Sequence, residues 1–142
     1  MPKTRVFVYG TLRRFEGNHY LLDDASYVGQ ALTDAKYTML HLGGYPGVIR
    51  AGCTSIFGEL YDVDPTTIGR LDLLEGHPTF YRRTKVDVLR LAKGTSPEPS
   101  KWEQVSTYLL PEMWMNGGPV ITSGDWCKQH VSVDEVPRGV LQ

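Results

Sequence analysis

The sequence is poor in cysteine and has no excess of either charge. Of its 142 residues only Cys53 and Cys127 are cysteines, so it holds neither a disulfide framework nor a paired CxxC metal motif. Fifteen basic and sixteen acidic side chains give a formal net charge of -1. Proteins that bind nucleic acids or anionic membranes usually carry a strong positive bias, so we expect neither kind of partner.

Long apolar runs are also lacking. No stretch approaches the apolar length that a membrane span requires, and the opening residues MPKTRVFV are too short an apolar run for a signal peptide. With both thiols expected to be reduced, these features predict a cytoplasmic protein. The chain length is typical of one domain, so we expect a single domain over 1–142, in which 133–142 form a loose tail.

What the sequence does contain is a series of short strand-like segments separated by turn residues. Fifteen glycines and nine prolines indicate many turns. Segments rich in β-branched, aromatic or alternating residues predict strands at 5–9, 26–33, 36–42, 55–63, 81–91 and 104–110. The GGYPG segment at 43–47 and residues 92–100 are expected to be loops, and Tyr45 is placed to rim a pocket. Together these elements predict an α+β fold with one dominant, curved sheet.

Two helices are expected between the strands. Asn18 is placed to cap a short helix that runs through Leu22 and Ala25. A second helix begins at Asp64, a suitable N-cap, and Pro65, a favoured first helical residue. It ends at Glu75, and the next residue, Gly76, suits the position that follows a helix.

Glu75 stands in an unusual place on this second helix. At about 100° per residue it falls between Ile68 and Leu71, within the apolar face, whereas Asp72 lies at the margin of that face. Burial and the negative end of the helix dipole would both raise the pKa of Glu75, toward values suited to proton transfer. The position fits a proton-transfer group, and it also fits a structural carboxylate bonded to a strand backbone or to Arg82 or Arg83.

The second feature is the segment Tyr9-Gly10-Thr11-Leu12, directly after the first strand. A glycine at a strand end allows successive backbone N–H groups to form a concavity for an anion or an oxyanion, and Thr11 would add a hydroxyl donor. On its own, however, the segment is better explained as a tight turn with a buried Leu12. It gains meaning when it is combined with a separate carboxylate.

Other residue types give weaker signals. A cysteine nucleophile would need a nearby base, such as His41 or His77 beside Cys53, but no local signature supports one. Cys127 is expected to pack with Trp126 in the core or tail. The four histidines show no metal-ligand spacing, so no metal site is expected. Arg13-Arg14 and Arg82-Arg83 are expected to be solvated or to lie at a pocket rim.

The two features, in this order, resemble the gamma-glutamylcyclotransferase-like superfamily, with the closest match to its gamma-glutamylamine cyclotransferase and avirulence-induced-gene-like branch. The similarity covers nearly the whole chain, except the loop after Leu91 and the last residues. It is carried by VFVYGTL at 6–12, Tyr45-Pro46, GELYDV at 58–63, LDLLEG at 71–76, YRR at 81–83 and SGDW at 123–126.

This resemblance implies a small mixed β-barrel with a few short helices packed on it and a cavity at one end. Members of the family release 5-oxoproline from a gamma-glutamyl amine or peptide without a metal or cofactor. Here the acid/base residue would be Glu75, and the substrate-holding loop would be Tyr9, Gly10, Thr11 and Leu12. Tyr45 and Tyr81 are expected to line the substrate pocket.

A second kind of function remains open at this stage. The same cavity would also suit a non-catalytic module that binds a small carboxylated ligand, in which Glu75 orients a ligand amine. A small-molecule gamma-glutamyl compound is the expected partner in the catalytic case, and the sequence carries no signal for an oligomeric state. In either case Gly10→Val is expected to block the pocket with little loss of fold.

Overall fold

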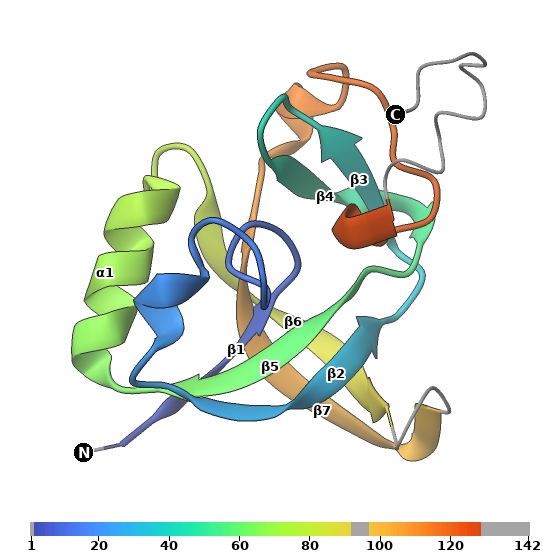
Figure 1. The fold of residues 1–142 in the computed structure, drawn as a ribbon. Helices are drawn as coiled ribbons and strands as arrows, with labels where there is room; N and C mark the ends of the chain where they lie inside the picture. Colours follow the sequence, from blue (N-terminus) through green and yellow to red (C-terminus); the bar gives the residue numbers. More distant parts are fainter. Residues whose placement is uncertain (1, 92–96, 129–142) are drawn as a thin grey trace.

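A closed barrel of five strands dominates the computed structural model, which describes residues 2–91 and 97–128 (Figure 1). The strands follow the order β1-β5-β2-β6-β7 around the barrel, with bounds β1 Thr4–Val8, β2 Ser26–Thr33, β5 Phe57–Val63, β6 Arg82–Leu91 and β7 Pro97–Leu109. Neighbours run antiparallel, except that β1 and β7 are parallel where Val6 faces Ser106. The expected α+β class and the small mixed barrel are confirmed.

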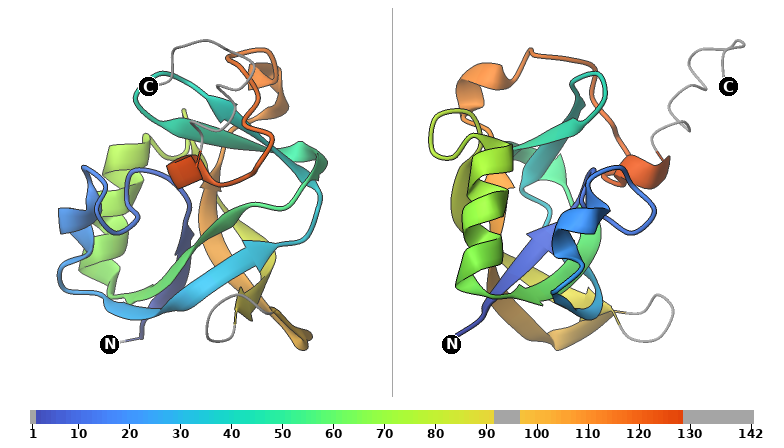
Figure 2. Two further views of the ribbon diagram at one scale, coloured as in Figure 1. Left: turned by 45° about the vertical axis from the view of Figure 1, so that its right-hand side comes forward. Right: turned by 60° about the vertical axis from the view of Figure 1, so that its left-hand side comes forward.

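Two further strands, β3 (Tyr37–His41) and β4 (Pro46–Thr54), form a separate antiparallel hairpin. Figure 2 shows this hairpin above one end of the barrel, at the same end as the last turn of the main helix. Because β1 also ends there, the chain brings three separate segments to one end of the barrel.

The strand predictions were wrong in two places. The structure places β4 where no strand was predicted, because the glycines and proline of the GGYPG segment indicated a loop, whereas its Pro46 and Gly47 open the strand. Residues 97–100 were expected to belong to a loop, but they open β7, whose Pro97 faces Leu91 of β6. The rest of that loop, 92–96, and the expected tail at 133–142 lie outside the described residues.

The helix α1 spans Pro65–Glu75, as predicted. The Asp64 carboxylate accepts a hydrogen bond of 2.8 Å from the Thr67 amide, and Gly76 ends the helix with a φ of 69°. The short helix after Asn18 is a 3-10 helix, η1 (His19–Leu22), and another, η2 (Glu112–Trp114), follows β7. No helix within residues 2–91 and 97–128 is long and apolar enough to cross a membrane.

The strand β1 is buried on both of its faces. Successive side chains of a strand point in opposite directions, and here Phe7 enters one buried cluster while Val6 and Val8 enter another. The neighbouring strand β5 approaches closely at Gly58, where a Cβ atom would lie 2.4 Å from the Val8 carbonyl oxygen. The end of β1, and therefore the start of the loop that follows it, is held firmly in place.

Candidate active site

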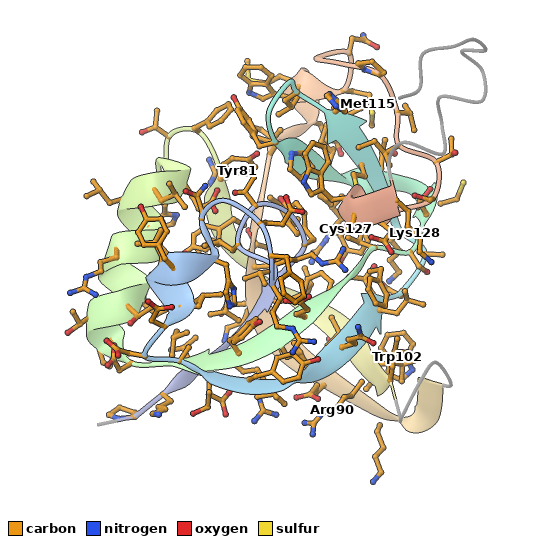
Figure 3. The ribbon with its side chains drawn as sticks, viewed as in Figure 1. Tyr81, Arg90, Trp102, Met115, Cys127 and Lys128 are labelled. Atoms are coloured by element: carbon orange, nitrogen blue, oxygen red, sulfur yellow. The ribbon has the colours of Figure 1, made fainter. Side chains whose placement is uncertain are left out.

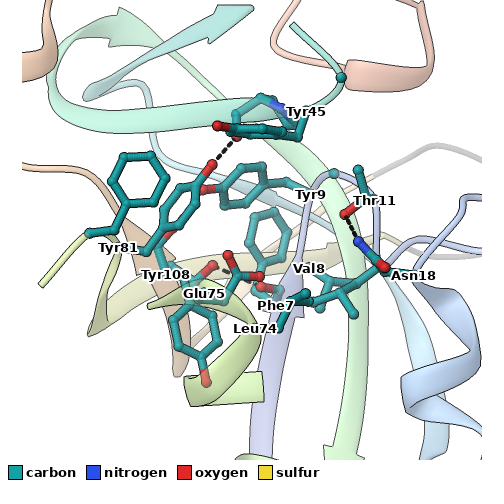
Figure 4. A pocket seen from close by; sticks show the side chains of 16 residues that line it. Phe7, Val8, Tyr9, Thr11, Asn18, Tyr45, Leu74, Glu75, Tyr81 and Tyr108 are labelled. Carbon is teal, nitrogen blue, oxygen red and sulfur yellow. Dashed lines mark hydrogen bonds between the residues drawn. The ribbon is translucent and has the colours of Figure 1, made fainter. Parts of the chain in front are cut away.

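A cavity of about 340 Å³ opens at the barrel end where β1 finishes (Figure 4). This volume lies within the roughly 300–1,000 Å³ that is typical of small-molecule sites. Its wall comes from β1 and the following loop up to Asn18, the β3–β4 turn with the start of β4, the end of α1, the segment before β6, and β7. The lining residues are Phe7, Val8, Tyr9, Gly10, Thr11, Leu12, Asn18, Gly44, Tyr45, Pro46, Leu74, Glu75, Phe80, Tyr81, Thr107 and Tyr108.

The structure brings together every residue that the sequence assigned to a site. One catalytic and six substrate-binding residues were predicted, and all of them line this cavity: Tyr9, Gly10, Thr11, Leu12, Tyr45, Glu75 and Tyr81. They come from three regions that lie far apart in the sequence, at 9–12, 45 and 75–81. Their individual roles in binding or catalysis stay predictions.

Glu75, the last residue of α1, points into the cavity, as Figure 4 shows. Burial raises the pKa of its carboxyl group from the ordinary value of 4.5 to about 7. Within the described part of the chain, no hydrogen bond or ion pair engages this carboxylate. It is therefore a group that can hold or release a proton near neutral pH and is free to contact a ligand.

The alternative in which an arginine neutralises Glu75 does not occur. The guanidinium of Arg83 bonds the carboxylate of Asp72 instead, at 3.0 and 3.1 Å, and Arg82 is exposed. The Tyr108 hydroxyl also donates to Asp72, at 2.6 Å. Asp72, predicted at the margin of the apolar face, is thus the structural carboxylate of this helix.

The Gly10–Leu12 loop forms a tight turn at the cavity wall. The amide of Arg13 donates to the carbonyl of Gly10 at 3.0 Å, which closes the turn, and Leu12 is buried as expected. None of the hydrogen bonds among the described residues uses the amides of Thr11 or Leu12 as donors. These two N–H groups are therefore available to an anionic ligand group.

Thr11 has a partner, Asn18, for which the sequence predicted a different role. Asn18 was expected to cap the short helix, but its side chain makes no capping bond and donates through Nδ2 to Thr11 Oγ1 at 2.9 Å. Because the Thr11 hydroxyl accepts this bond, its own proton remains available for a ligand. The Asn18 side chain thereby orients the hydroxyl donor of the loop.

Gly10 faces the hairpin across a very short gap. A Cβ atom at this position would lie 2.6 Å from Cγ and 2.8 Å from Cδ of Pro46, the first residue of β4. A rigid proline ring cannot move aside as a flexible side chain would. The expectation that Gly10→Val would cause little loss of fold is therefore wrong, since any side chain here forces the loop and β4 apart. That it would block the pocket stays a prediction.

Two of the cavity tyrosines, Tyr9 and Tyr81, donate hydrogen bonds to backbone carbonyl groups. The Tyr9 hydroxyl donates to the carbonyl of Tyr108 at 2.6 Å, and the Tyr81 hydroxyl donates to the carbonyl of Pro46. Burial raises the pKa of both phenols well above the usual range, and the nearby Glu75 carboxylate acts in the same direction. Both stay protonated at neutral pH, and both form walls. Tyr45, 40% exposed, stands at the rim.

Several lining residues were not identified from the sequence. Thr107 and Tyr108 are neighbours on β7, and the Thr107 hydroxyl donates to the Phe7 carbonyl at 2.8 Å. Their position depends on how β7 aligns with β1 across the barrel, for which the sequence has no local signal. Phe80 and Leu74 were within reach of prediction, because they adjoin the predicted residues Tyr81 and Glu75.

Two other assignments need correction. Arg13, expected to be solvated or at a rim, is 6% exposed and forms ion pairs with Glu59 and Asp125. Cys53 and Cys127 are both exposed, so Cys127 does not pack in the core, although the adjacent tryptophan does.

The described residues contain neither a cysteine paired with a histidine base nor a cluster of metal ligands. The His41 ring packs at a tilt against Trp126, and His77 accepts a bond from the Arg83 amide. Neither ring is bonded to Cys53 among the described residues. Within 2–91 and 97–128, no group of three or more His, Cys, Asp or Glu side chains is placed to hold a metal ion.

Comparison with known proteins identifies the family of the chain. Residues 6–128 match the family model described as "Gamma-glutamyl cyclotransferase, AIG2-like". A Vibrio cholerae protein named "Putative gamma-glutamylcyclotransferase" is 37% identical over 126 residues, covering 87% of this chain and 96% of its own. A gamma-glutamylcyclotransferase family protein of Escherichia coli is 34% identical over 122 residues, covering 86% and 95%.

Among solved structures, an AIG2-like protein from Mus musculus superposes with a TM-score of 0.67 at 29% identity. The superposition covers 77% of this chain and 78% of the mouse protein. Family model, sequence relatives and fold agree over nearly the same residues. The chain therefore belongs to the AIG2-like gamma-glutamylcyclotransferase family.

Proposed function

We propose that the protein is a gamma-glutamyl cyclotransferase that releases 5-oxoproline from a gamma-glutamyl amine or gamma-glutamyl peptide. The observation that carries this proposal is Glu75: an unpaired carboxyl group that points into a ligand-sized cavity and has a pKa of about 7. Membership of the family supplies the reaction class. The arrangement of the cavity supports a mechanism in which one side chain moves a proton within one folded substrate.

The reaction needs no nucleophile from the protein. The α-amine of the substrate attacks its own γ-carbonyl carbon, so a carbon–nitrogen bond forms in the five-membered ring as the bond to the departing amine breaks. Both reacting groups belong to one molecule, and holding it in the folded conformer supplies much of the rate. Glu75 accepts the proton that the attacking amine loses and delivers it to the departing amine, so protons balance and no water is consumed.

The negative charges of the substrate, on its α-carboxylate and on the developing oxyanion, would contact uncharged donors of the cavity. Among the lining residues in the described part of the chain, only Glu75 has a charged side chain. The free amides of Thr11 and Leu12 and the Thr11 hydroxyl are the donors available for the α-carboxylate or for the oxyanion that develops on the γ-carbonyl. Tyr45, Leu74 and Phe80 provide an apolar wall against which the departing amine can lie.

We also propose a cytoplasmic location. Cys53 and Cys127 are both unpaired and exposed, which suits a compartment that keeps thiols reduced. Neither thiol takes part in the proposed reaction.

A substrate panel tests the function. The purified protein is incubated with gamma-glutamyl amines and gamma-glutamyl dipeptides, and 5-oxoproline is quantified by chromatography and mass spectrometry. We expect release from at least one compound, and a loss of at least about a hundredfold in Glu75→Gln, which keeps the side-chain shape but cannot accept the proton. If no compound is turned over while ligands still bind, the non-catalytic binding module replaces this proposal.

A further inference from the structure

A buried ion cluster lies outside the cavity and connects the loop after β1 to the SGDW segment at 123–126. Arg13, Glu59 and Asp125 are 6%, 5% and 8% exposed. One nitrogen of the Arg13 guanidinium lies 2.7 Å from Asp125 Oδ1, and Nε lies 3.5 Å from Glu59 Oε2. Neither the proposed reaction nor the cavity lining uses any of the three side chains, so their burial calls for another explanation.

Arg13 and Arg14 tie the substrate-holding loop to this cluster. Arg13 directly follows Leu12, and its amide closes the Gly10 turn at 3.0 Å while its guanidinium reaches the carboxylates. The amide of Arg14 donates to Glu59 Oε1 at 3.0 Å, and the Tyr61 hydroxyl donates to the same oxygen at 3.0 Å. The end of the loop is therefore fixed by both its backbone and its side chains.

The segment that carries Asp125 is itself anchored to the barrel and to the hairpin. The Phe57 amide of β5 donates to the Gly124 carbonyl at 2.9 Å. Gly124 has a φ of 71°, and a Cβ atom there would lie 2.1 Å from the Ser55 carbonyl oxygen. Only a glycine fits this close approach, which sets the position of the next residue, Asp125.

The same segment holds the loop and the hairpin together. Trp126 Nε1 donates to Glu16 Oε1 at 3.2 Å on the loop, and its ring lies 5.2 Å from that of His41 on β3. The His41 amide donates to the Pro119 carbonyl at 2.8 Å. Residues 126–128 form a short 3-10 turn, on which Figure 3 labels Cys127 and Lys128. Two walls of the cavity, the loop and the hairpin, are thus joined through one segment.

A buried ion pair is weak evidence for stability, because removing two charges from water offsets much of their attraction. What the pair does provide is a fixed geometry, since the guanidinium can satisfy both carboxylates only in one orientation. We propose that Arg13 and Asp125 are a positioning pair, which holds the Gly10–Leu12 loop in the conformation that receives the substrate. The kinetic part of this inference rests on the proposed function, whereas the effect on loop conformation does not.

The test compares Asp125→Asn with Asp62→Asn. Asp62 pairs with Arg5 at 2.8 Å near the start of β1, the end of the strand away from the cavity, so it controls for the loss of an Arg–Asp pair as such. Amide hydrogen exchange at Arg13 and Arg14 reports the loop without any substrate. We expect Asp125→Asn to speed exchange at these two amides about tenfold or more, with β6 amides unchanged, and Asp62→Asn to leave all of them unchanged.

The kinetic arm uses the substrate found with the panel. We expect kcat/KM of the folded Asp125→Asn protein to fall about tenfold or more, while the pKa seen in its pH profile remains that of the wild type. Arg13→Lys keeps the charge but cannot bridge both carboxylates, so its kcat/KM should lie between those of the wild type and Asp125→Asn. The kcat/KM of Asp62→Asn should stay within about twofold of the wild-type value.

Each result decides something different. Unchanged exchange at Arg13 and Arg14 in Asp125→Asn overturns the positioning pair, as does an equal change in Asp62→Asn. Faster exchange with an unchanged kcat/KM overturns its effect on catalysis. If the wild-type protein turns over no compound in the panel, the proposed function fails, and the exchange measurement alone then decides whether the pair holds the loop.

Discussion

The carboxylate of Asp72 binds the hydroxyl of Tyr108, with 2.6 Å between Oδ1 and the phenol oxygen. Arg83 of β6 holds the same carboxylate through two further bonds. Asp72 lies three residues before Glu75, on the adjacent turn of α1, so these bonds fix the rotation of the helix that carries the proposed acid/base group. The backbone carbonyl of Tyr108 also accepts a hydrogen bond from the Tyr9 hydroxyl. Tyr108 of β7 therefore contacts both α1, through Asp72, and the residue that follows β1, Tyr9.

Removing the Tyr108 hydroxyl should therefore weaken the docking of α1. Tyr108→Phe loses a bond to a charged group, and we expect the free energy of unfolding to fall by about 1–2 kcal/mol. Urea unfolding measures this change. Tyr20→Phe, at a side chain that is 64% exposed, is the control and should have little effect. Equal stability of the two variants would contradict a structural role for the Tyr108–Asp72 bond.

The raised pKa of Glu75 predicts a stability that depends on pH. Its pKa is about 7 in the folded chain against an ordinary 4.5, so between these values the folded state binds more protons than the unfolded state and stability falls as pH rises. Glu75→Gln removes this effect. Relative to wild type, the variant should gain on the order of 2 kcal/mol between about pH 5 and pH 8. Urea unfolding at both values tests this, and a constant difference would contradict the raised pKa.

The same group should appear in the kinetics. If Glu75 removes a proton from the substrate amine, its carboxylate form is required, and kcat/KM should rise with pH through an apparent pKa of about 7. Rates of 5-oxoproline release from about pH 5 to 9 give the profile. A profile that is flat across neutral pH would argue against Glu75 as the base.

Gly10 and Gly17 form a matched pair for testing the close approach of the loop to the hairpin. Gly10→Ala puts a Cβ atom 2.6 Å from the Pro46 ring, whereas a Cβ atom at Gly17, outside the cavity lining, meets nothing within 4 Å. We expect Gly10→Ala to lose about 1–3 kcal/mol of stability from overpacking and to lower kcat/KM, and Gly17→Ala to do neither. Thermal unfolding and the 5-oxoproline assay report both effects. Equal behaviour of the two variants would refute the tight contact.

The hydroxyl of Thr11 is testable without altering the loop shape. Thr11→Val replaces the hydroxyl with a methyl group, and we expect kcat/KM to fall about tenfold, the loss expected for one hydrogen bond that the substrate would otherwise receive. Thr11→Ser keeps the donor and should remain near wild type. If both variants show the same rate, the hydroxyl contributes nothing to the reaction.

Local patterns were enough to predict α1 and its most important residue. A cap at Asp64, a stop at Gly76 and a helical period of 3.6 residues are all contained in the short segment that they describe. The phase of Glu75 relative to Ile68 and Leu71 followed from that period alone. Strands with clear alternation, such as Phe57–Val63, were likewise found within two residues of their bounds.

Features that depend on distant partners could not be predicted. Arg13 resembles any solvated arginine until the barrel brings Asp125, 112 residues away, to its guanidinium. Tyr108 reaches the cavity only because the register of β7 places it there. In β4 and at the start of β7, glycine and proline favoured loops locally, and pairing with a neighbouring strand overrode that preference.

The bonds from Tyr9 to the Tyr108 carbonyl and from Tyr81 to the Pro46 carbonyl join the cavity walls to each other. They exist before any substrate arrives, so the loss of entropy on ordering these walls accompanies folding and not association. Complexes formed with analogues of different size should therefore differ mainly in what lies at the exposed Tyr45 rim. Under the proposed function, substitutions at this rim would change the selectivity among gamma-glutamyl compounds. The inner walls would keep the same conformation with each of these substrates.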